Sequence, residues 1–205
     1  MNIEKLKIFL FVLVIAAAAI WLSYGNDGAL ENIKEKKFPK DAIKHHPVVF
    51  SNTKSNLKVK EGYIIKVFRN DQLEYPIFFT GLQTSIWFEE NKPESAKFSA
   101  AIEASSIQSG NEEMDAHAKE QTVLDAELFP LIVFESTSVK KIESGYEATG
   151  NLKMKGIIKE IKMPFVFRND TFSGKFEIGA NDFAITRDGA SSGIIKIELT
   201  IPVTK

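Results

Sequence analysis

Residues 195–203 read Ile-Lys-Ile-Glu-Leu-Thr-Ile-Pro-Val, and this stretch decides the fold class. Every second residue is apolar, and the residues between are charged, polar or proline. Successive side chains of a β-strand point to opposite faces, so the pattern is typical of a strand with one buried face and one wet face. Pro202 lies on the polar face and cannot donate to a ladder, which indicates an edge or a bulge there.

The same alternation recurs from about residue 48 to the C-terminus. We predict strands over 62–69, 76–88 with a break near Gly81, 97–104, 131–135, 146–154, 161–168, 172–178 and 195–203. Asn169-Asp170 separates two of these ranges and is a candidate two-residue hairpin turn. So many strands in one chain predict an all-β domain, either a closed antiparallel barrel of about eight strands or a sandwich.

One stretch, residues 112–129, lacks the alternation. Val123, Leu124 and Leu128 recur there at near-helical spacing, and Pro130 ends the stretch. We therefore expect one short helical excursion within the domain.

Two N-terminal segments are predicted to lie outside the fold. Residues 1–25 combine an early basic region, fifteen apolar residues from Ile8 to Leu22, and small residues at the end, which predicts a signal peptide. A retained signal anchor over residues 8–24 is the alternative, since a helix of that length spans roughly 25 Å. Both alternatives export the chain to the periplasm or cell envelope, either soluble or anchored. We predict a polar tether over 26–47 and the β domain over 48–205.

Composition excludes several classes of function. The net charge is −1, so the chain as a whole does not attract nucleic acid. There is no Cys and there are only three His, which removes disulfides, thiol catalysis and most metal sites, so we expect no metal and no cofactor. No nucleophile elbow or phosphate-binding glycine loop is present, and an enzyme is therefore not expected. Sixteen Phe predict a large apolar interior.

Whether that interior is filled or hollow is open from the residues alone. A barrel of about eight strands either fills with side chains or holds one small ligand. The aromatic side chains on apolar faces, which could fill it, are Phe98, Phe134, Phe165, Phe167 and Phe176. The small residues that could leave room are Ala100, Ala148, Gly150 and Gly156. Composition by itself favours the filled core.

Five stretches carry a resemblance that reverses this preference. They are residues 96–110, Asp115-Ala116-His117, residues 124–137, residues 150–164 around Gly150-Asn151-Leu152-Lys153-Met154-Lys155-Gly156, and residues 176–185. Together, and in this order, they resemble the YceI-like family of exported lipid-binding barrels, over roughly residues 57–203. The resemblance implies an extended antiparallel lipocalin-like β-barrel that holds a polyisoprenoid chain inside.

The function implied by the resemblance is binding or transport of a long apolar isoprenoid-type lipid in the cell envelope, without bond chemistry. The expected contact residues share the inward-facing positions of the strands. They are Phe98, Ala100, Ile102, Ile132, Phe134, Ala148, Leu152, Met154, Met163, Phe165, Phe176, Ile197 and Leu199. Asp115 and His117 are candidates for contact with the lipid's polar head, although they could instead cap a turn or the start of the helical excursion.

The expected partners follow from the same interpretation. They are an isoprenoid or other long-chain lipid, a membrane contacted through the N-terminus, and a second copy of the chain in a homodimer; nucleic acid is not among them. The alternative function is a membrane-tethered structural or interaction domain whose barrel core is filled.

Overall fold

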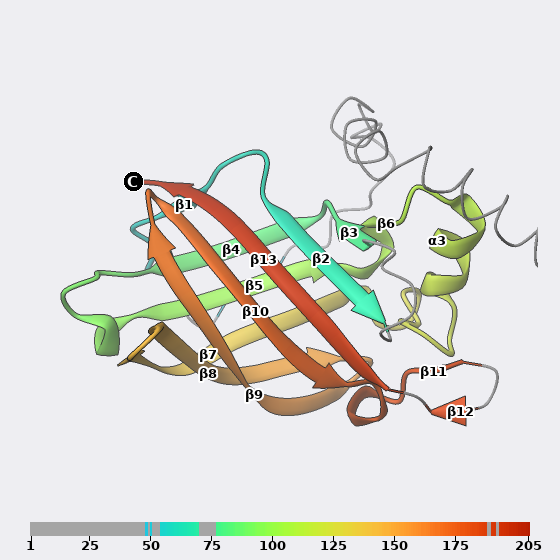
Figure 1. Ribbon diagram of the computed structural model, residues 1–205. Coiled ribbons are helices and arrows are strands. Elements are labelled where there is room, and N and C mark those ends of the chain that lie inside the picture. The colour runs from blue at the N-terminus through green and yellow to red at the C-terminus, as the bar shows by residue number, and fades with distance from the viewer. Residues whose placement is uncertain (1–47, 49, 51–53, 70–76, 188–189, 192) are drawn as a thin grey trace, which may run out of the picture. The chain divides into compact units, whose positions relative to one another are not determined.

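The computed structural model describes residues 48, 50, 54–69, 77–187, 190–191 and 193–205 (Figure 1). The predicted signal or anchor segment and the tether lie outside the described residues. Within the described part, no helix is long and apolar enough to cross a membrane. The described residues form one eleven-stranded antiparallel sheet, a separate two-stranded sheet, and one α-helix.

Eight strands of the large sheet have six residues or more. They are β2 (Ile64–Arg69), β4 (Leu82–Trp87), β5 (Lys97–Glu103), β7 (Leu131–Ile142), β8 (Gly145–Met154), β9 (Ile157–Arg168), β10 (Thr171–Gly179) and β13 (Ile194–Thr204). The shorter strands are β1 (Lys58–Val59), β3 (Ile77–Phe79), β6 (Ile107–Gln108), β11 (Thr186–Arg187) and β12 (Ala190–Ser191), of which the last two pair only with each other. The helix is α3 (Glu112–Lys119), and the 3-10 turns are η2 (Pro93–Ser95), η3 (Ala104–Ser106) and η4 (Ala180–Phe183). The predicted all-β architecture with one short helix is confirmed.

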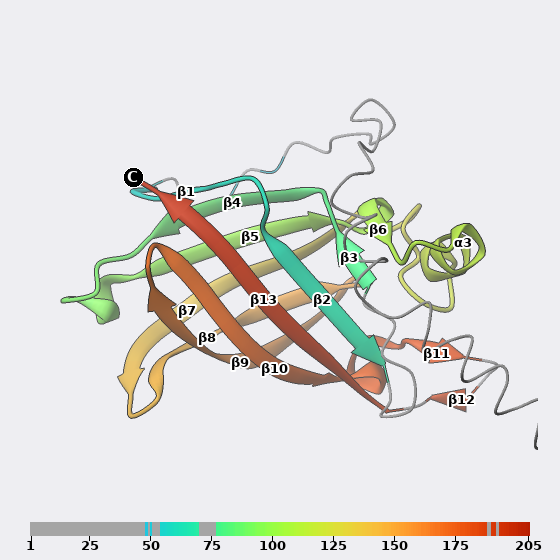
Figure 2. The same cartoon turned by 45° about the horizontal axis from the view of Figure 1, so that its top comes forward.

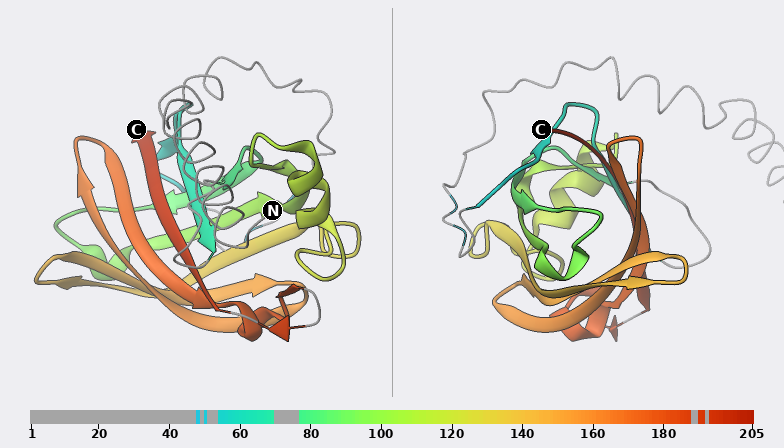
Figure 3. Two further views of the ribbon diagram at one scale, coloured as in Figure 1. Left: turned by 45° about the vertical axis from the view of Figure 1, so that its right-hand side comes forward. Right: turned by 90° about the vertical axis from the view of Figure 1, so that its left-hand side faces the viewer.

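The large sheet curls until its two ends approach each other. Its strand order is β4-β5-β7-β8-β9-β10-β13-β2-β3-β6, with β1 also paired to β13. In Figure 2, β9, β10 and β13 cross in front of β5 and β7, and the end view in Figure 3 shows the strands curving round a common interior. The long strands therefore all turn one face toward the same enclosed space.

A short strap, residues 54–60, bridges β4, at one end of the strand order, and β13. Asn56 N–H donates to the carbonyl of Ile86 in β4 at 2.9 Å, and Lys60 N–H donates to the carbonyl of Pro202 in β13 at 2.8 Å. Pro202 stands where β13 changes partner from β2, whose pairing ends at Thr200, to β1. The proline therefore marks a change of partner, where a ladder N–H is not needed, and not a bulge.

Two tight turns close the hairpins on either side of β9. Asn169 and Asp170 have φ of 51° and 53°, and Lys155 and Gly156 have φ of 52° and 74°. Left-handed backbone at both central residues is what a type I′ hairpin turn requires. The predicted Asn169-Asp170 turn is confirmed, and the second turn places Gly156 at a hairpin tip.

β7 extends well beyond the predicted strand 131–135, and a β-bulge lies directly after the point where the prediction ended. Its register with β8 shifts between Ser136 and Ser138, which adds one residue to β7. Phe134 and Val139 are consequently both buried, although they are five positions apart and would lie on opposite faces of a regular strand. The bulge breaks the alternation, and for this reason the sequence pattern ended the strand too early.

The predicted helical excursion exists, but it lies nearer the start of the 112–129 stretch. Asn111 caps α3, with its side-chain oxygen accepting from Glu113 N–H at 3.0 Å and Met114 N–H at 3.1 Å. Asp125 has a φ of 50°, which no helix accommodates. Val123, Leu124 and Leu128 therefore lie in turns after the helix and do not share a helical face.

Tyr63 fastens the corner between β3 and β4 to the start of β2. Its hydroxyl donates to the carbonyl of Thr80 and accepts from Leu82 N–H at 3.2 Å. Burial raises the pKa of Tyr63 above its ordinary value of 10.0, while the hydrogen bond from Leu82 acts in the opposite direction. The hydroxyl is therefore held neutral by the fold.

We predict that Tyr63→Phe lowers the free energy of unfolding by about 1 kcal/mol, because the carbonyl of exposed Thr80 and the N–H of half-buried Leu82 lose their shared partner. The loss is measured by urea denaturation near pH 7. Tyr146→Phe is the matched control, since the Tyr146 hydroxyl has no hydrogen bond among the described residues, and its effect should stay within about 0.5 kcal/mol.

The sign of the pH effect follows from the raised pKa. In the unfolded chain Tyr63 ionises first, so its contribution to stability is complete below pH 10 and is lost as the pH rises further. The stability gap between the wild type and Tyr63→Phe should narrow above pH 10, and a gap that widens there would contradict the assignment.

Candidate functional site

The curled sheet encloses a cavity of about 770 Å³ that extends from the inner faces of the strands to α3. This volume falls within the roughly 300–1,000 Å³ that is usual for small-molecule sites. Nearly all of the lining is aliphatic or aromatic, and the polar side chains in it are Thr84, Ser99, His117 and Ser173. The cavity is therefore an apolar compartment built into the core of the domain.

Twelve of the thirteen predicted contact residues line this cavity. They are Phe98, Ala100, Ile102, Ile132, Phe134, Leu152, Met154, Met163, Phe165, Phe176, Ile197 and Leu199. They come from β5, β7, β8, β9, β10 and β13, and the period-two alternation places them all on the concave face. The remaining residue, Ala148, lies outside the lining.

β8 shows why Ala148 does not reach the cavity. Ala148 has no exposed surface, and a Cβ added to Gly150 would meet the carbonyl of Glu135 and lie 2.7 Å from two ring atoms of Phe134. The space above these small residues is already occupied, in the case of Gly150 by a phenyl ring. Further along the strand, Leu152 and Met154 line the cavity. The expectation that Ala148 and Gly150 leave room for a ligand was wrong.

Of the other two small residues, one leaves room and one does not. Gly156 sits at the β8–β9 hairpin tip, and a Cβ there would come within 2.9 Å of the ring of Phe129. Glycine is needed for the positive φ of this turn and for the close approach of that ring. Ala100 does line the cavity. Its short side chain is a real source of open space.

Aromatic rings fill the end of the barrel opposite α3. Their centroids lie 4.6–6.0 Å apart in ten pairs, mostly edge to face. The members of this aromatic cluster are Phe88, Phe98, Tyr146, Phe165, Phe167 and Phe172. The core is therefore filled at the end with the β9–β10 hairpin and hollow toward α3. Of the two alternatives left open by the sequence, the filled interior describes the end with the β9–β10 hairpin, and the hollow interior describes the end near α3.

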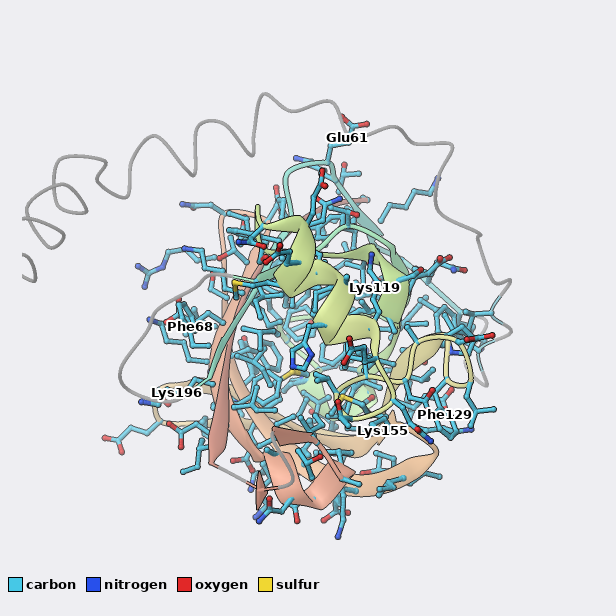
Figure 4. The ribbon with its side chains drawn as sticks, turned by 90° about the vertical axis from the view of Figure 1, so that its right-hand side faces the viewer. Glu61, Phe68, Lys119, Phe129, Lys155 and Lys196 are labelled. Carbon is cyan, nitrogen blue, oxygen red and sulfur yellow. The ribbon has the colours of Figure 1, made fainter. Side chains whose placement is uncertain are left out.

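The end of the cavity nearest α3, which we call its mouth, is lined by residues of α3, of the turns that follow α3 and of the segment after η4; Figure 4 views the domain from this end. Met114 and Ala118 of α3 are four residues apart and so share a helical face, and both belong to the lining. Val123, Leu124 and Ile185 complete this end. The near-helical spacing of Val123 and Leu124 signalled apolar contact, although the contact is made from turns.

Sequence reasoning also missed lining residues on β2, β3 and β4. These include Ile65, Val67, Ile77, Phe79, Leu82 and Ile86. The alternation of Ile65 and Val67 was visible, but short strands give too few repeats to decide which face turns inward.

Three hydrogen bonds tie the two loops of the mouth together. Thr186 N–H donates to the carbonyl of Thr122 at 2.9 Å. Lys155 Nζ donates to the carbonyls of Gln121 and Ala184, each at 2.8 Å. Partial burial lowers the pKa of Lys155, while the carboxylate of Asp125 acts in the opposite direction. Figure 4 shows Lys155 at this end of the domain, below α3.

The structure separates the two candidates for a head-group contact. The carboxylate of Asp115 accepts from the backbone N–H of Ser109 at 2.6 Å and from its hydroxyl at 2.7 Å, and Asp115 does not line the cavity. It therefore holds the turn that precedes α3. His117 does line the cavity, and its Nδ1 lies 3.0 Å from Glu120 Oε2. It is the one titratable side chain among the described lining residues.

The electrostatics of the cavity restrict what it can hold. Among its described lining residues there is no Asp, Glu, Lys or Arg. A charged group inside would lose its hydration with no opposite charge nearby, at a cost of several kcal/mol. Among the described residues, no group of three or more acidic or His side chains could hold a metal ion. The compartment is chemically suited to an uncharged hydrocarbon chain.

A family model for the YceI-like domain matches residues 47–204. The chain belongs to the YceI-like family. A UPF0312 protein of Yersinia pestis (strain Pestoides F) is 31% identical over 134 residues, which cover 60% of this chain and 70% of the relative.

Two solved structures share the fold of this YceI-like domain. BcnA of Burkholderia cenocepacia has a TM-score of 0.64 at 17% identity, over 70% of this chain and 96% of that one. The YCEI protein of Campylobacter jejuni has a TM-score of 0.54 at 20% identity, over 80% of this chain and 99% of that one. The resemblance found in the sequence is confirmed at the level of family and fold.

We predict that Gly150→Ala destabilises the domain, because its Cβ has no free space beside the ring of Phe134 and the carbonyl of Glu135. Overpacking of this kind costs about 1–3 kcal/mol, measured as the loss in free energy of unfolding. Asn151→Ala, at the exposed neighbouring position of the same strand, is the control and should change stability by less than about 0.5 kcal/mol. Equal stability of the two variants would show that the ring moves aside.

Proposed function

We propose that this domain binds and carries a long, uncharged isoprenoid-type lipid inside its barrel. The observation that carries the proposal is the 770 Å³ cavity, whose described lining contains no acidic or basic side chain except His117 at the mouth. Membership of the YceI-like family supports the same function. No step of bond chemistry is part of the proposal.

The driving force is the removal of the lipid chain from water. Each buried methylene contributes about 0.8 kcal/mol, so a five-carbon prenyl unit contributes up to roughly 3–4 kcal/mol. Association costs about 4–15 kcal/mol in lost freedom of motion, so several units must be buried for micromolar binding. This balance favours long linear lipids over short ones.

The polar head of such a lipid would lie at the α3 end. The aromatic cluster closes the opposite end, and the α3 end supplies His117, the one titratable side chain of the described lining. An uncharged head suits the apolar interior, whereas a charged head would have to stay outside the mouth. We retain His117 as the head-group contact and assign Asp115 to the turn that it holds.

We further propose that binding takes place in the cell envelope. This rests on the hydrophobic pattern of residues 8–24, which predicts export of the chain. The alternative function, an interaction domain with a filled barrel, is disfavoured by the open cavity between the strands and α3.

The test of the proposal is direct recovery of the ligand. Protein purified from bacterial cells is extracted with organic solvent, and we expect mass spectrometry to find a prenyl lipid in near-stoichiometric amount. Adding that lipid to delipidated protein should raise the melting temperature, because the ligand binds only the folded state. No bound lipid and no stabilisation by prenyl alcohols would overturn the lipid-carrier function.

Ala100→Phe should abolish lipid binding and keep the fold. Ala100 lines the cavity, so a phenyl ring there occupies the ligand's space and adds apolar contacts. We expect lipid content to fall at least tenfold while the melting temperature of the lipid-free protein holds or rises.

Val166→Phe is the matched control for Ala100→Phe. Val166 is 44% exposed and does not line the cavity, so the added ring lies outside and lipid content should be unchanged. A loss of stability of about 1–3 kcal/mol in lipid-free Ala100→Phe would instead show that this part of the core is already filled.

A further inference from the structure

We propose that the rings of Phe98, Phe165 and Phe172 form a floor that sets the greatest length of lipid chain the cavity accepts. This inference rests on the proposed function. It adds a specificity determinant, because it states which feature of the ligand the barrel measures.

The three rings close the cavity across its width. Phe98 comes from β5, Phe165 from β9 and Phe172 from β10. Their centroids are 5.5, 5.6 and 5.7 Å apart, at interplanar angles of 61–82°. Ring centroids at these separations are in van der Waals contact, edge to face. All three rings line the cavity, and an alkyl chain cannot pass between them.

A second layer of rings supports the floor from behind. Phe88 lies 5.9 Å from Phe98, 6.0 Å from Phe165 and 5.2 Å from Phe172, and it does not line the cavity. Phe167 and Tyr146 in turn contact Phe88 at 5.1 and 5.3 Å. The floor therefore cannot tilt away from a ligand without displacing a packed layer.

The strap at the start of the domain holds Phe88 in place. The side chain of Asn56 donates to the carbonyl of Phe88 and accepts from its N–H, each at 3.0 Å. This reciprocal pair fixes the backbone of Phe88 at the end of β4. Phe88 is only 4% exposed. The depth of the cavity is thus set by rings whose positions are determined by the fold.

A fixed floor predicts a break in the dependence of affinity on chain length. While the chain still fits, each further buried methylene strengthens binding by about fourfold. Once the tail reaches the rings, added carbons stay in water at the mouth and contribute nothing. Removing a ring should therefore move the break to a longer chain.

The experiment uses the full chain and a series of all-trans prenyl alcohols of two to nine isoprene units. Each alcohol competes with a fluorescent fatty-chain probe. We expect the wild-type affinity to rise with length and then level off. In Phe172→Ala the break should move by about one five-carbon unit, which matches the volume of the deleted ring.

Phe176→Ala is the matched control. Phe176 lies on the same strand and the same face as Phe172, four positions further along, with Gly174 midway between them. It lines the cavity wall but does not belong to the aromatic cluster. Its removal widens the cavity, so the break should stay where it is. If Phe172→Ala does not fold, Phe172→Leu makes a smaller opening and should give a smaller shift in the same direction.

The outcomes separate the two proposals. A wild-type affinity that rises through the whole series without a break overturns the floor. So does a break that keeps its position in Phe172→Ala or Phe172→Leu while binding is retained. If no prenyl alcohol competes with the probe in the wild type, the proposed function itself fails, whatever the rings do.

Discussion

Contact between aromatic rings from four strands is the interaction on which the rest of this domain depends. Phe88, directly after β4, and Phe98 of β5 touch rings from β9 and β10, and two further strands separate these two pairs in the order of the sheet. Because the rings meet only if the sheet has curled, the cluster stabilises the closed form of the sheet specifically. It also fills one end of the barrel, whereas the cavity occupies the other end.

The open end carries an energetic cost that the loops at the mouth reduce. An unfilled apolar space lacks dispersion contacts on one side and is unfavourable unless a ligand or a cover restores them. α3 contributes Met114 and Ala118 to the cover, and Lys155 ties the loops beside it through two backbone carbonyls. The domain therefore combines a half packed with aromatic rings and a half whose cover rests on a few hydrogen bonds.

The described lining of the cavity offers apolar contacts and contains no Asp, Glu, Lys or Arg, so it suits an uncharged ligand. Hydrocarbon contact is non-directional, so the walls alone do not distinguish one long chain from another. In the function that we propose, discrimination comes from the two ends, at His117 on the α3 side and at the aromatic rings on the other. Head group and chain length are accordingly the properties on which this compartment can act.

The sequence alone determined which face of β5, β7, β8, β9, β10 and β13 turns inward, because the period-two alternation of strands leaves little choice once one face is apolar. It predicted twelve of the lining residues for that reason, and it predicted the hairpin at Asn169-Asp170 from the turn residues between two alternating ranges. Only the tertiary structure decided whether an inward position is filled or empty. Gly150 and Ala100 look alike in sequence, yet a ring from β7 covers the first, whereas the second lines the cavity. That difference depends on how a ring of the neighbouring strand leans across its diagonal partner, because Phe134 pairs with Leu152 and reaches over Gly150, two positions away on β8.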